Sequence, residues 1–325
     1  MDRMRLAVID LGTVSSRLLL AEVEDGAIVS SRKRTVITDL GEGVDATGRL
    51  APAAIGRVVD ACAGFKGLIG EFAPRAVATT LTSAARDAEN GRELVSALEG
   101  LGLAPQVIEG EVEAALTFFG VARDFEGGRI AVADSGGGST ELVVGSWRQG
   151  EPVELERAVS LQVGCRRMTE RFWGSGKPSP AAVERAAGYA RGCFEGFWGD
   201  VDRAPGQLVA VGGTVTTLVA MARGMKVYDS SLVHLSTLGL DEVDAAIERL
   251  GALDVEQIAS LPGIQPKRAP VILGGAVAVA ELMRAGGYTE LVVSENSLMA
   301  GMVPTIVEAI RGSSTSIGWS PRLSW

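Results

Sequence analysis

The sequence predicts an α/β fold built from two related halves, each a mostly parallel sheet with helices on its faces. Three observations lead to this fold class. The chain has 325 residues, enough for two domains of ordinary size. Short apolar runs that end in turn residues alternate with stretches of helical apolar spacing, which is typical of parallel sheets. The amino-terminal strand pattern also recurs 124 residues later, which indicates an internal duplication.

The duplication aligns RLAVIDLGTVSSRLLL, which begins at Arg5, with RIAVADSGGGSTELVV in the second half, and it needs no gap. It places Asp10 on Asp134 and Gly12 on Gly136. Each copy predicts an apolar strand that ends in Asp, a tight glycine-containing turn, and further apolar strands separated by a second turn.

Helical spacing of apolar residues follows each repeated unit, over 55–72 in the first half and 183–197 in the second. Further strands are expected after these helices, each followed by a turn signal and a helix-like run. They cover residues 76–81, 106–108, 208–211 and 290–293.

The predicted organisation is two lobes with a cleft between them. The first lobe covers about residues 1–124, and a helix at about 297–311 is expected to pack back on it. The second lobe covers about 125–296. Residues 312–325 are Ser-rich and aperiodic, so we expect a flexible tail there.

The charge balance narrows the classes of partner. Lys and Arg number 31 and Asp and Glu 40, so the net charge is −9. A nucleic-acid-binding protein gains affinity from many basic side chains on phosphates, so we expect no nucleic-acid partner. An anionic substrate held in a small local basic site stays compatible with this charge.

The cysteines and the apolar runs favour a cytoplasmic protein. Cys62, Cys165 and Cys193 form no C-x-x-C pair, so neither a disulfide framework nor a zinc site is expected. The apolar run before Asp10 is too short for a signal peptide. The longest uncharged stretch, 204–222, is broken by proline, glycine and threonine, so we expect no membrane span.

A glycine run in the second copy predicts a phosphate-binding loop. Gly136, Gly137 and Gly138 follow a strand and precede Ser139, and such a run lets backbone N–H groups converge on an anion. A hairpin turn is the simpler interpretation, but three consecutive glycines exceed what a hairpin needs. Asp134, just before the run, offers an oxygen ligand to a divalent cation.

A second candidate anion site lies at Gly213 and Thr214, which follow an apolar strand and open a helix-like run. A helix N-terminus offers N–H groups and a partial positive charge. Close packing of strand and helix explains the glycines equally well.

His234 is the sole histidine and has no partner at ligand spacing, so we interpret it as a packed or surface residue.

These segments belong to a series of motifs that resembles the exopolyphosphatase and guanosine pentaphosphate phosphatase family, within the actin–Hsp70–sugar kinase superfamily. The resemblance covers nearly the whole chain, and the motifs stand in the order of the family. They read DLGTVSSRL, TSAARDAENG, EGEVEA, DSGGGSTEL, VGGTVTTL and VSENSLMAGM. The resemblance implies two actin-like (ribonuclease H-like) lobes and hydrolysis of the terminal phosphoanhydride of inorganic polyphosphate, with release of orthophosphate.

The resemblance also implies roles for single residues. Glu113 aligns with the catalytic glutamate that orients and deprotonates water; without the resemblance, Glu111 and Glu113 would only complement a helix dipole. Mg²⁺, with Mn²⁺ as an alternative, would be held by Asp134 together with Glu141 or Asp10. The phosphate-binding residues would be Gly12, Thr13, Ser15, Arg17, Arg86, Gly136, Gly137, Gly138, Ser139, Gly213 and Thr214.

The sequence departs from the family pattern at Val14, where the family has Asn, and at Ala115, where it often has Arg. These departures leave open a sensor that binds phosphate or nucleotide without turnover. Guanosine pentaphosphate is the alternative substrate, and an ATP-dependent kinase is disfavoured because it needs an adenosine pocket and an acceptor site. The negative net charge favours short polyphosphate chains. The assembly state stays open, a homodimer included.

Overall fold

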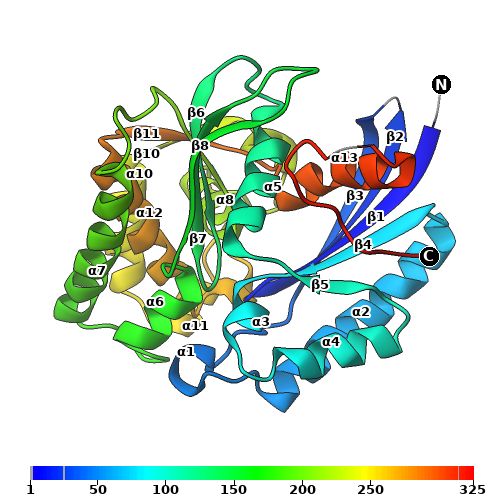
Figure 1. Ribbon diagram of the computed structural model, residues 1–325. Helices are drawn as coiled ribbons and strands as arrows, with labels where there is room; N and C mark the ends of the chain where they lie inside the picture. Colours follow the sequence, from blue (N-terminus) through cyan, green and yellow to red (C-terminus); the bar gives the residue numbers. More distant parts are fainter. Residues whose placement is uncertain (1–2, 25, 314) are drawn as a thin grey trace. The chain divides into compact units, whose positions relative to one another are not determined.

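The computed structural model describes residues 3–24, 26–313 and 315–325, and it divides into two compact units (Figure 1). Unit 1 holds residues 1–120, 150–153 and 298–325, and unit 2 holds 121–149 and 154–297. Residues 1, 2, 25 and 314, which fall in the predicted first lobe and tail, lie outside the described residues.

The sheet of unit 1 has the strand order β12–β4–β1–β2–β3, and β5 also pairs with β4. The hairpin strands β1, β2 and β3 run antiparallel, whereas β4 lies parallel to β1. The bounds are β1 Arg3–Leu11, β2 Ser15–Glu24, β3 Ala27–Ile37, β4 Ala76–Leu81, β5 Pro105–Val107 and β12 Leu323–Ser324.

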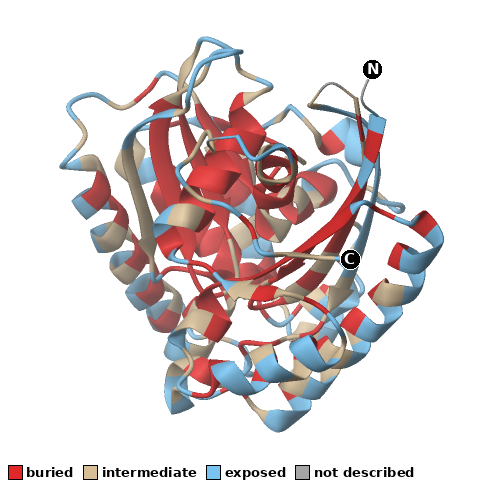
Figure 2. Ribbon diagram, turned by 45° about the vertical axis from the view of Figure 1, so that its right-hand side comes forward, coloured by how far each residue is buried: buried red, intermediate tan, exposed pale blue. Residues whose placement is uncertain are grey.

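Helices cover both faces of this sheet, because successive strand residues point to opposite sides. On β1, Ala7 and Ile9 pack with α2 and α4, whereas Leu6 and Val8 pack with α13. Figure 2 shows the resulting buried layers along the central strands. The helices are α1 Val44–Thr47, α2 Pro52–Phe72, α3 Ser83–Asp87, α4 Gly91–Gly100, α5 Gly110–Ala122 and α13 Leu298–Arg311.

The sheet of unit 2 has the strand order β10–β11–β9–β6–β7–β8, and four of its strands repeat the arrangement of β1 to β4. Its antiparallel hairpin strands β6, β7 and β8 correspond to β1, β2 and β3, and β9 lies parallel to β6 as β4 does to β1. The predicted α/β class is therefore confirmed. The bounds are β6 Arg129–Ser135, β7 Thr140–Ser146, β8 Glu154–Leu161, β9 Leu208–Val211, β10 Ser236–Gly239 and β11 Glu290–Val293.

The core of unit 2 lies on one face of its sheet. Ala131 and Ala133 of β6 point into this core, which α7 and α12 close with Phe194, Phe197 and Ala276 among others. Residues of opposite parity on β6 therefore point to the other face. The remaining elements are α6 Cys165–Phe172, α7 Pro180–Trp198, α8 Gly213–Ala222, α9 Ser230–Val233, α10 Leu240–Gly251, α11 Val255–Ala259, a 3₁₀ turn at Pro266–Arg268, and α12 Ile272–Gly286.

The described part of the carboxy-terminal segment is not the flexible tail that the sequence suggests. Leu323 and Ser324 form β12, which pairs antiparallel with Ala78 and Val77 of β4. The short strand β5 pairs only with residues 79–81, so β12 occupies the part of the β4 edge that β5 leaves. Trp319 packs on the same apolar cluster as α13. This segment is stabilised by single apolar side chains and by pairing with an open strand edge. Neither interaction leaves a periodic pattern in the sequence, so the sequence did not predict it.

No helix in the described residues is long and apolar enough to cross a membrane.

Burial raises the pKa of the Cys62 thiol to about 12, because the thiolate would lose its hydration in the core of unit 1.

The crossing of α13 and α5 yields a stability prediction. A Cβ at Gly301 would lie 1.8 Å from the carbonyl oxygen of Leu116, so Gly301→Ala forces the two helices apart. We expect it to lower the free energy of unfolding by about 2–4 kcal/mol, as overpacking and lost burial do. The matched control is Gly188→Ala on α7, where a Cβ meets nothing within 4 Å. The control should raise stability by about 0.5–1 kcal/mol in a denaturant titration. Equal effects of both variants would contradict the account.

Candidate active site

The first hairpin places an acid and a base directly opposite each other. Asp10 on β1 is in register with Arg17 on β2, and their side chains form an ion pair of 2.6 Å between Oδ2 and a guanidinium nitrogen. Asp10 is 1% exposed, and among the described residues its carboxylate accepts no hydrogen bond of good geometry. A buried carboxylate with this little hydrogen bonding has capacity for a further ligand.

The turn between these strands is short and firmly anchored. The Gly12 N–H donates to the Ser15 carbonyl at 3.0 Å, which closes the turn. The carbonyls of Thr13 and Val14 accept hydrogen bonds from the backbone of residues 38–41. The Val14 side chain is buried, so its departure from the family pattern exchanges a polar contact for apolar packing.

Glu113 and Arg86 form a second acid–base pair in unit 1. The Arg86 guanidinium donates to Glu113 Oε2 at 3.0 Å and to the Ile108 carbonyl at 2.8 Å. Glu113, on α5, is 6% exposed, whereas Glu111, two residues earlier on the same helix, is exposed to solvent. Helix-dipole compensation needs no burial, so it accounts for Glu111 but not for Glu113.

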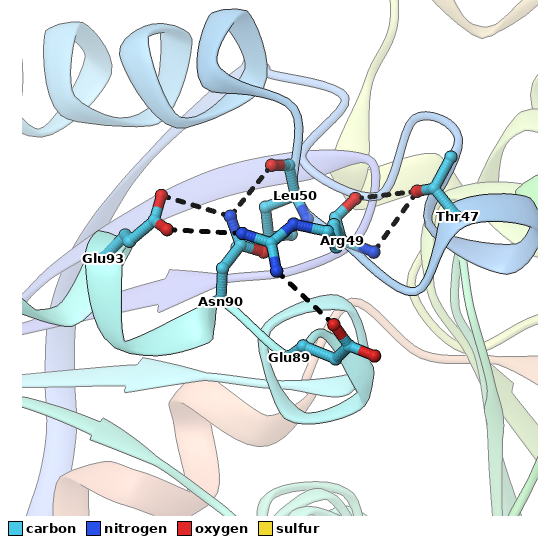
Figure 3. Close-up of polar contacts among 6 residues, drawn as sticks. All are labelled: Thr47, Arg49, Leu50, Glu89, Asn90 and Glu93. Carbon is cyan, nitrogen blue, oxygen red and sulfur yellow. Dashed lines mark hydrogen bonds and ion pairs between the residues drawn. The ribbon is translucent and has the colours of Figure 1, made fainter.

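The segment that carries Arg86 is held by Asn90, which Figure 3 shows between two loops. The Asn90 side chain accepts from the Leu50 N–H at 2.7 Å and donates to the Leu50 carbonyl at 3.1 Å. It also donates to Glu93 at 3.2 Å. This amide is almost wholly buried and ties the start of α2 to the start of α4, which fixes the intervening α3 and its arginine.

The second hairpin places two carboxylates opposite each other. Asp134 on β6 is in register with Glu141 on β7, and both are at least 95% buried. Glu141 Oε1 accepts a hydrogen bond of 2.7 Å from the Ser160 hydroxyl. Gly212 lies beside Asp134 with φ near 103°, and a Cβ there would stand 3.0 Å from Asp134 Oδ1 and 2.6 Å from the Ser135 carbonyl. Glycine is therefore required where β9 passes this carboxylate.

The glycine loop after Asp134 is oriented by the N-terminus of α6. The Gly136 carbonyl accepts from the Cys165 N–H at 2.9 Å, and the Gly137 carbonyl accepts from the Arg166 N–H at 2.9 Å. The Gly138 carbonyl accepts from Arg167 Nε at 2.6 Å. Because the N–H and C=O of a planar peptide point in opposite directions, these bonds turn the N–H groups of the loop away from α6.

Close backbone contact completes this arrangement. A Cβ at Gly164 would lie 2.5 Å from the carbonyl carbon and oxygen of Gly137, so only glycine fits where α6 meets the loop. Arg166 and Arg167 contribute to this anchoring through their backbone N–H groups, which both donate to the Gly137 carbonyl.

The N-terminus of α8 carries a positive charge that the sequence did not indicate. Gly212 caps this ten-residue helix, and Thr214 in its first turn is 2% exposed. The Arg268 guanidinium lies against Gly213, where a Cβ would meet it at 2.0 Å. The glycine therefore admits a cation over the helix N-terminus, and both favour an anion there.

His234 is not associated with these groups. Its Nδ1 accepts from the Glu295 N–H at 3.2 Å, and its Nε2 lies 3.7 Å from Asp124. The side chain is about one-third exposed, which agrees with the packed or surface residue expected from the sequence.

The predicted residues thus form four local groups. In unit 1, Asp10 forms an ion pair with Arg17, and Glu113 forms an ion pair with Arg86. In unit 2, Asp134 lies opposite Glu141 on neighbouring strands, and Gly213 and Thr214 lie together at the start of α8. Sequence reasoning missed Ser160, Gly164 and Arg268, which lie outside the recurring motifs and whose partners are distant in the chain.

The packing of Gly164 predicts how the loop depends on α6. In Gly164→Ala the new Cβ displaces the Gly137 peptide, so the loop N–H groups lose their alignment. We expect phosphate release, assayed well below the melting temperature of the variant, to fall about 10²-fold or more, as when positioned oxyanion donors are lost. Gly176→Ala, where a Cβ meets nothing within 4 Å, should keep full activity. Full activity in Gly164→Ala would refute the role of this contact.

Comparison with known proteins identifies the family of this chain. Residues 19–309 match the model of the Ppx/GppA phosphatase family. The chain is 36% identical over 316 residues to exopolyphosphatase 2 of Mycobacterium tuberculosis, covering 92% of this chain and 97% of the relative. It is 29% identical over 316 residues to a guanosine-5′-triphosphate,3′-diphosphate pyrophosphatase of Vibrio parahaemolyticus, covering 94% of this chain and 60% of the relative.

Solved structures give the same relationship. An exopolyphosphatase-like protein superimposes with a TM-score of 0.85 at 31% identity, covering 94% of this chain and 98% of the other. A Ppx/GppA family member from Aquifex aeolicus superimposes with a TM-score of 0.77 at 29% identity, covering 97% and 100%. The chain therefore belongs to the Ppx/GppA phosphatase family, a family with an actin-like α/β fold.

Proposed function

We propose that this protein is an exopolyphosphatase, which hydrolyses the terminal phosphoanhydride of inorganic polyphosphate and releases orthophosphate. The observation that carries the proposal is the buried pair Asp134 and Glu141 at the foot of a glycine loop whose N–H groups are turned away from α6. The mycobacterial relative, named exopolyphosphatase 2, supports the substrate class. Short chains are the proposed preference, because the net charge of −9 disfavours extended tracking of a polyanion.

A magnesium ion fits the second hairpin. Two buried carboxylates side by side repel each other unless a cation or a shared proton intervenes. Mg²⁺ typically takes one or two protein carboxylates and completes its shell with water and substrate phosphate oxygens. Among the described residues, no three or more His, Cys, Asp or Glu side chains are placed so that they could together hold a metal ion. The Asp134–Glu141 pair suffices for a site of this open kind. Bound there, the ion would neutralise charge on the reacting phosphoryl group.

The proposed phosphate contacts come from backbone and side chains. The N–H groups of the glycine loop and the N-terminus of α8 would bind phosphate oxygens, with Arg268 adding a charge. In unit 1, the turn from Gly12 to Ser15 is the proposed counterpart. Arg17 pairs with Asp10, and it is the proposed phosphate-binding arginine of this hairpin, whereas Asp10 is the proposed metal-binding carboxylate of unit 1.

Glu113 is the proposed general base. Its carboxylate would orient a water molecule toward the terminal phosphorus and take one proton from it, while Arg86 holds the carboxylate in place. Little covalent work is needed beyond this step, since phosphoryl transfer depends chiefly on positioning and charge stabilisation.

Guanosine pentaphosphate is the second candidate substrate. The Vibrio relative, whose name describes a pyrophosphatase of guanosine-5′-triphosphate,3′-diphosphate, favours it. The chemistry at the phosphorus would be the same, so the machinery described above serves either substrate. We place the activity in the cytoplasm.

Glu113→Gln tests the proposed base directly. Glutamine keeps the size of the side chain and an acceptor for Arg86, but it cannot take a proton. We expect phosphate release to fall about 10²- to 10⁴-fold, the usual contribution of a positioned base, while calorimetry shows substrate binding retained. The control is Glu111→Gln on the same helix, which should keep near-normal turnover because that side chain is exposed. Near-normal turnover in Glu113→Gln, or an equal collapse in both variants, refutes the assignment.

Metal dependence tests the second hairpin. We expect chelation to abolish phosphate release and Mg²⁺ or Mn²⁺ to restore it. Asp134→Asn removes one charged ligand, so the Mg²⁺ concentration at half-maximal rate should rise about tenfold or more. Asp202→Asn, at an exposed position in unit 2, changes the net charge equally and should leave this concentration unchanged. Zinc dependence that survives excess Mg²⁺ would contradict the assignment.

A further inference from the structure

We propose that unit 1 carries a second anion site for a short condensed phosphate, in a pocket lined by Arg3, Arg5 and Arg75. The choice of condensed phosphate rests on the proposed function, whereas the pocket and its charge do not. The pocket has a volume of about 540 Å³ and is also lined by Met4, Glu22, Ala73 and Pro74. This volume lies within the range of small-ligand sites.

The strand arrangement brings the three arginines together. Arg3 and Arg5 point to the same side of β1, because residues two apart on a strand share a face. The Arg75 N–H donates to the Arg5 carbonyl at 2.8 Å, just before β4 begins its parallel pairing with β1. Arg75 therefore stands beside Arg5 at the same end of the sheet.

The pocket is positively charged in a chain whose net charge is −9. Among the described residues that line it, Glu22 on β2 is the single acidic one, and it pairs with Arg3 at 2.5 Å and with Arg5 at 3.4 Å. Three guanidiniums against one carboxylate leave a surplus of positive charge. Condensed phosphates carry closely spaced negative oxygens, which guanidinium forks bind in pairs.

Arg5 is held in place before any ligand binds. Its guanidinium donates to the Phe72 carbonyl at 3.2 Å and lies 5.4 Å from the centre of the Phe72 ring. Arg32 of β3 lies 5.6 Å from the centre of the same ring and adds charge beside the pocket. A guanidinium fixed by packing loses less side-chain entropy when it binds an anion. Arg3 and Arg75 are exposed and supply the adaptable contacts.

The pocket is separate from the candidate active site of unit 1. Six residues of β1 lie between Arg3 and Asp10, so the two positions are about 23 Å apart at the usual rise of a strand. A phosphate anion can therefore occupy it independently of the turn at Gly12. The anion can be a free short polyphosphate or a distant segment of a longer substrate chain, and the experiment separates the two.

The test compares Arg3→Gln/Arg75→Gln with wild type. Arg5 is left in place because it packs on Phe72. Tripolyphosphate is titrated by calorimetry into the full chain without divalent ions, so that no turnover occurs. We expect the double variant to lose one class of binding sites, with affinity there reduced at least about tenfold, since each lost charge-assisted hydrogen bond is worth that much. The control is Arg92→Gln/Arg249→Gln, which removes the same charge from exposed positions elsewhere and should bind as wild type.

Steady-state phosphate release supplies the second arm. An increased KM for long chains in the Arg3/Arg75 variant, with the KM for tripolyphosphate unchanged, identifies the occupant as a distant segment of the substrate. Unchanged KM values with the loss of calorimetric sites identify a free anion. Equal titrations of the variant, the control and wild type overturn the proposal. If wild type binds at this pocket but releases no orthophosphate, the proposed function fails and the second site stands.

Discussion

The antiparallel register of two hairpins is the constraint on which the candidate site depends. In each hairpin an aspartate near the end of the first strand faces a residue near the start of the second strand across a tight turn: Asp10 faces Arg17, and Asp134 faces Glu141. A slip of either strand by one residue would send its side chain of the pair to the opposite face of the sheet and so separate the two groups. The turns hold the register, and their first glycines donate to the serine carbonyls at 3.0 Å in both copies.

The two duplicated hairpins differ in charge at one equivalent position. Arg17 and Glu141 occupy equivalent positions 124 residues apart, so the first hairpin encloses an ion pair and the second encloses two carboxylates. An ion pair compensates its own charge, whereas a carboxylate pair is most stable with a cation. This difference explains why we assign the metal chiefly to the second hairpin. Anchoring of the turns has diverged too: a loop at residues 38–41 holds the first, and α6 holds the second.

Local patterns predicted much of this structure because they have local causes. Strand alternation, the glycine turns and the 124-residue repeat located the strands and turns of both hairpins, whereas the residues that face each other in them emerge only from the strand register. The anchoring of the loop could not be predicted, since Gly164 meets Gly137 only after α6 has packed. Arg268 has the same origin: it reaches Gly213 from a 3₁₀ turn more than fifty residues away, without any periodic signal. The packed carboxy-terminal segment depends on a strand edge that β5 leaves open.

The central claim is that two buried carboxylates and a backbone anion loop serve the hydrolysis of condensed phosphates. Orthophosphate release from tripolyphosphate, from chains of hundreds of phosphates and from guanosine pentaphosphate, at equal concentration of chain ends and with Mg²⁺ present, measures it most directly. The account predicts release from both polyphosphates, with the higher efficiency per chain end for tripolyphosphate. Release from guanosine pentaphosphate alone, or an efficiency that rises steadily out to the longest chains, would contradict it.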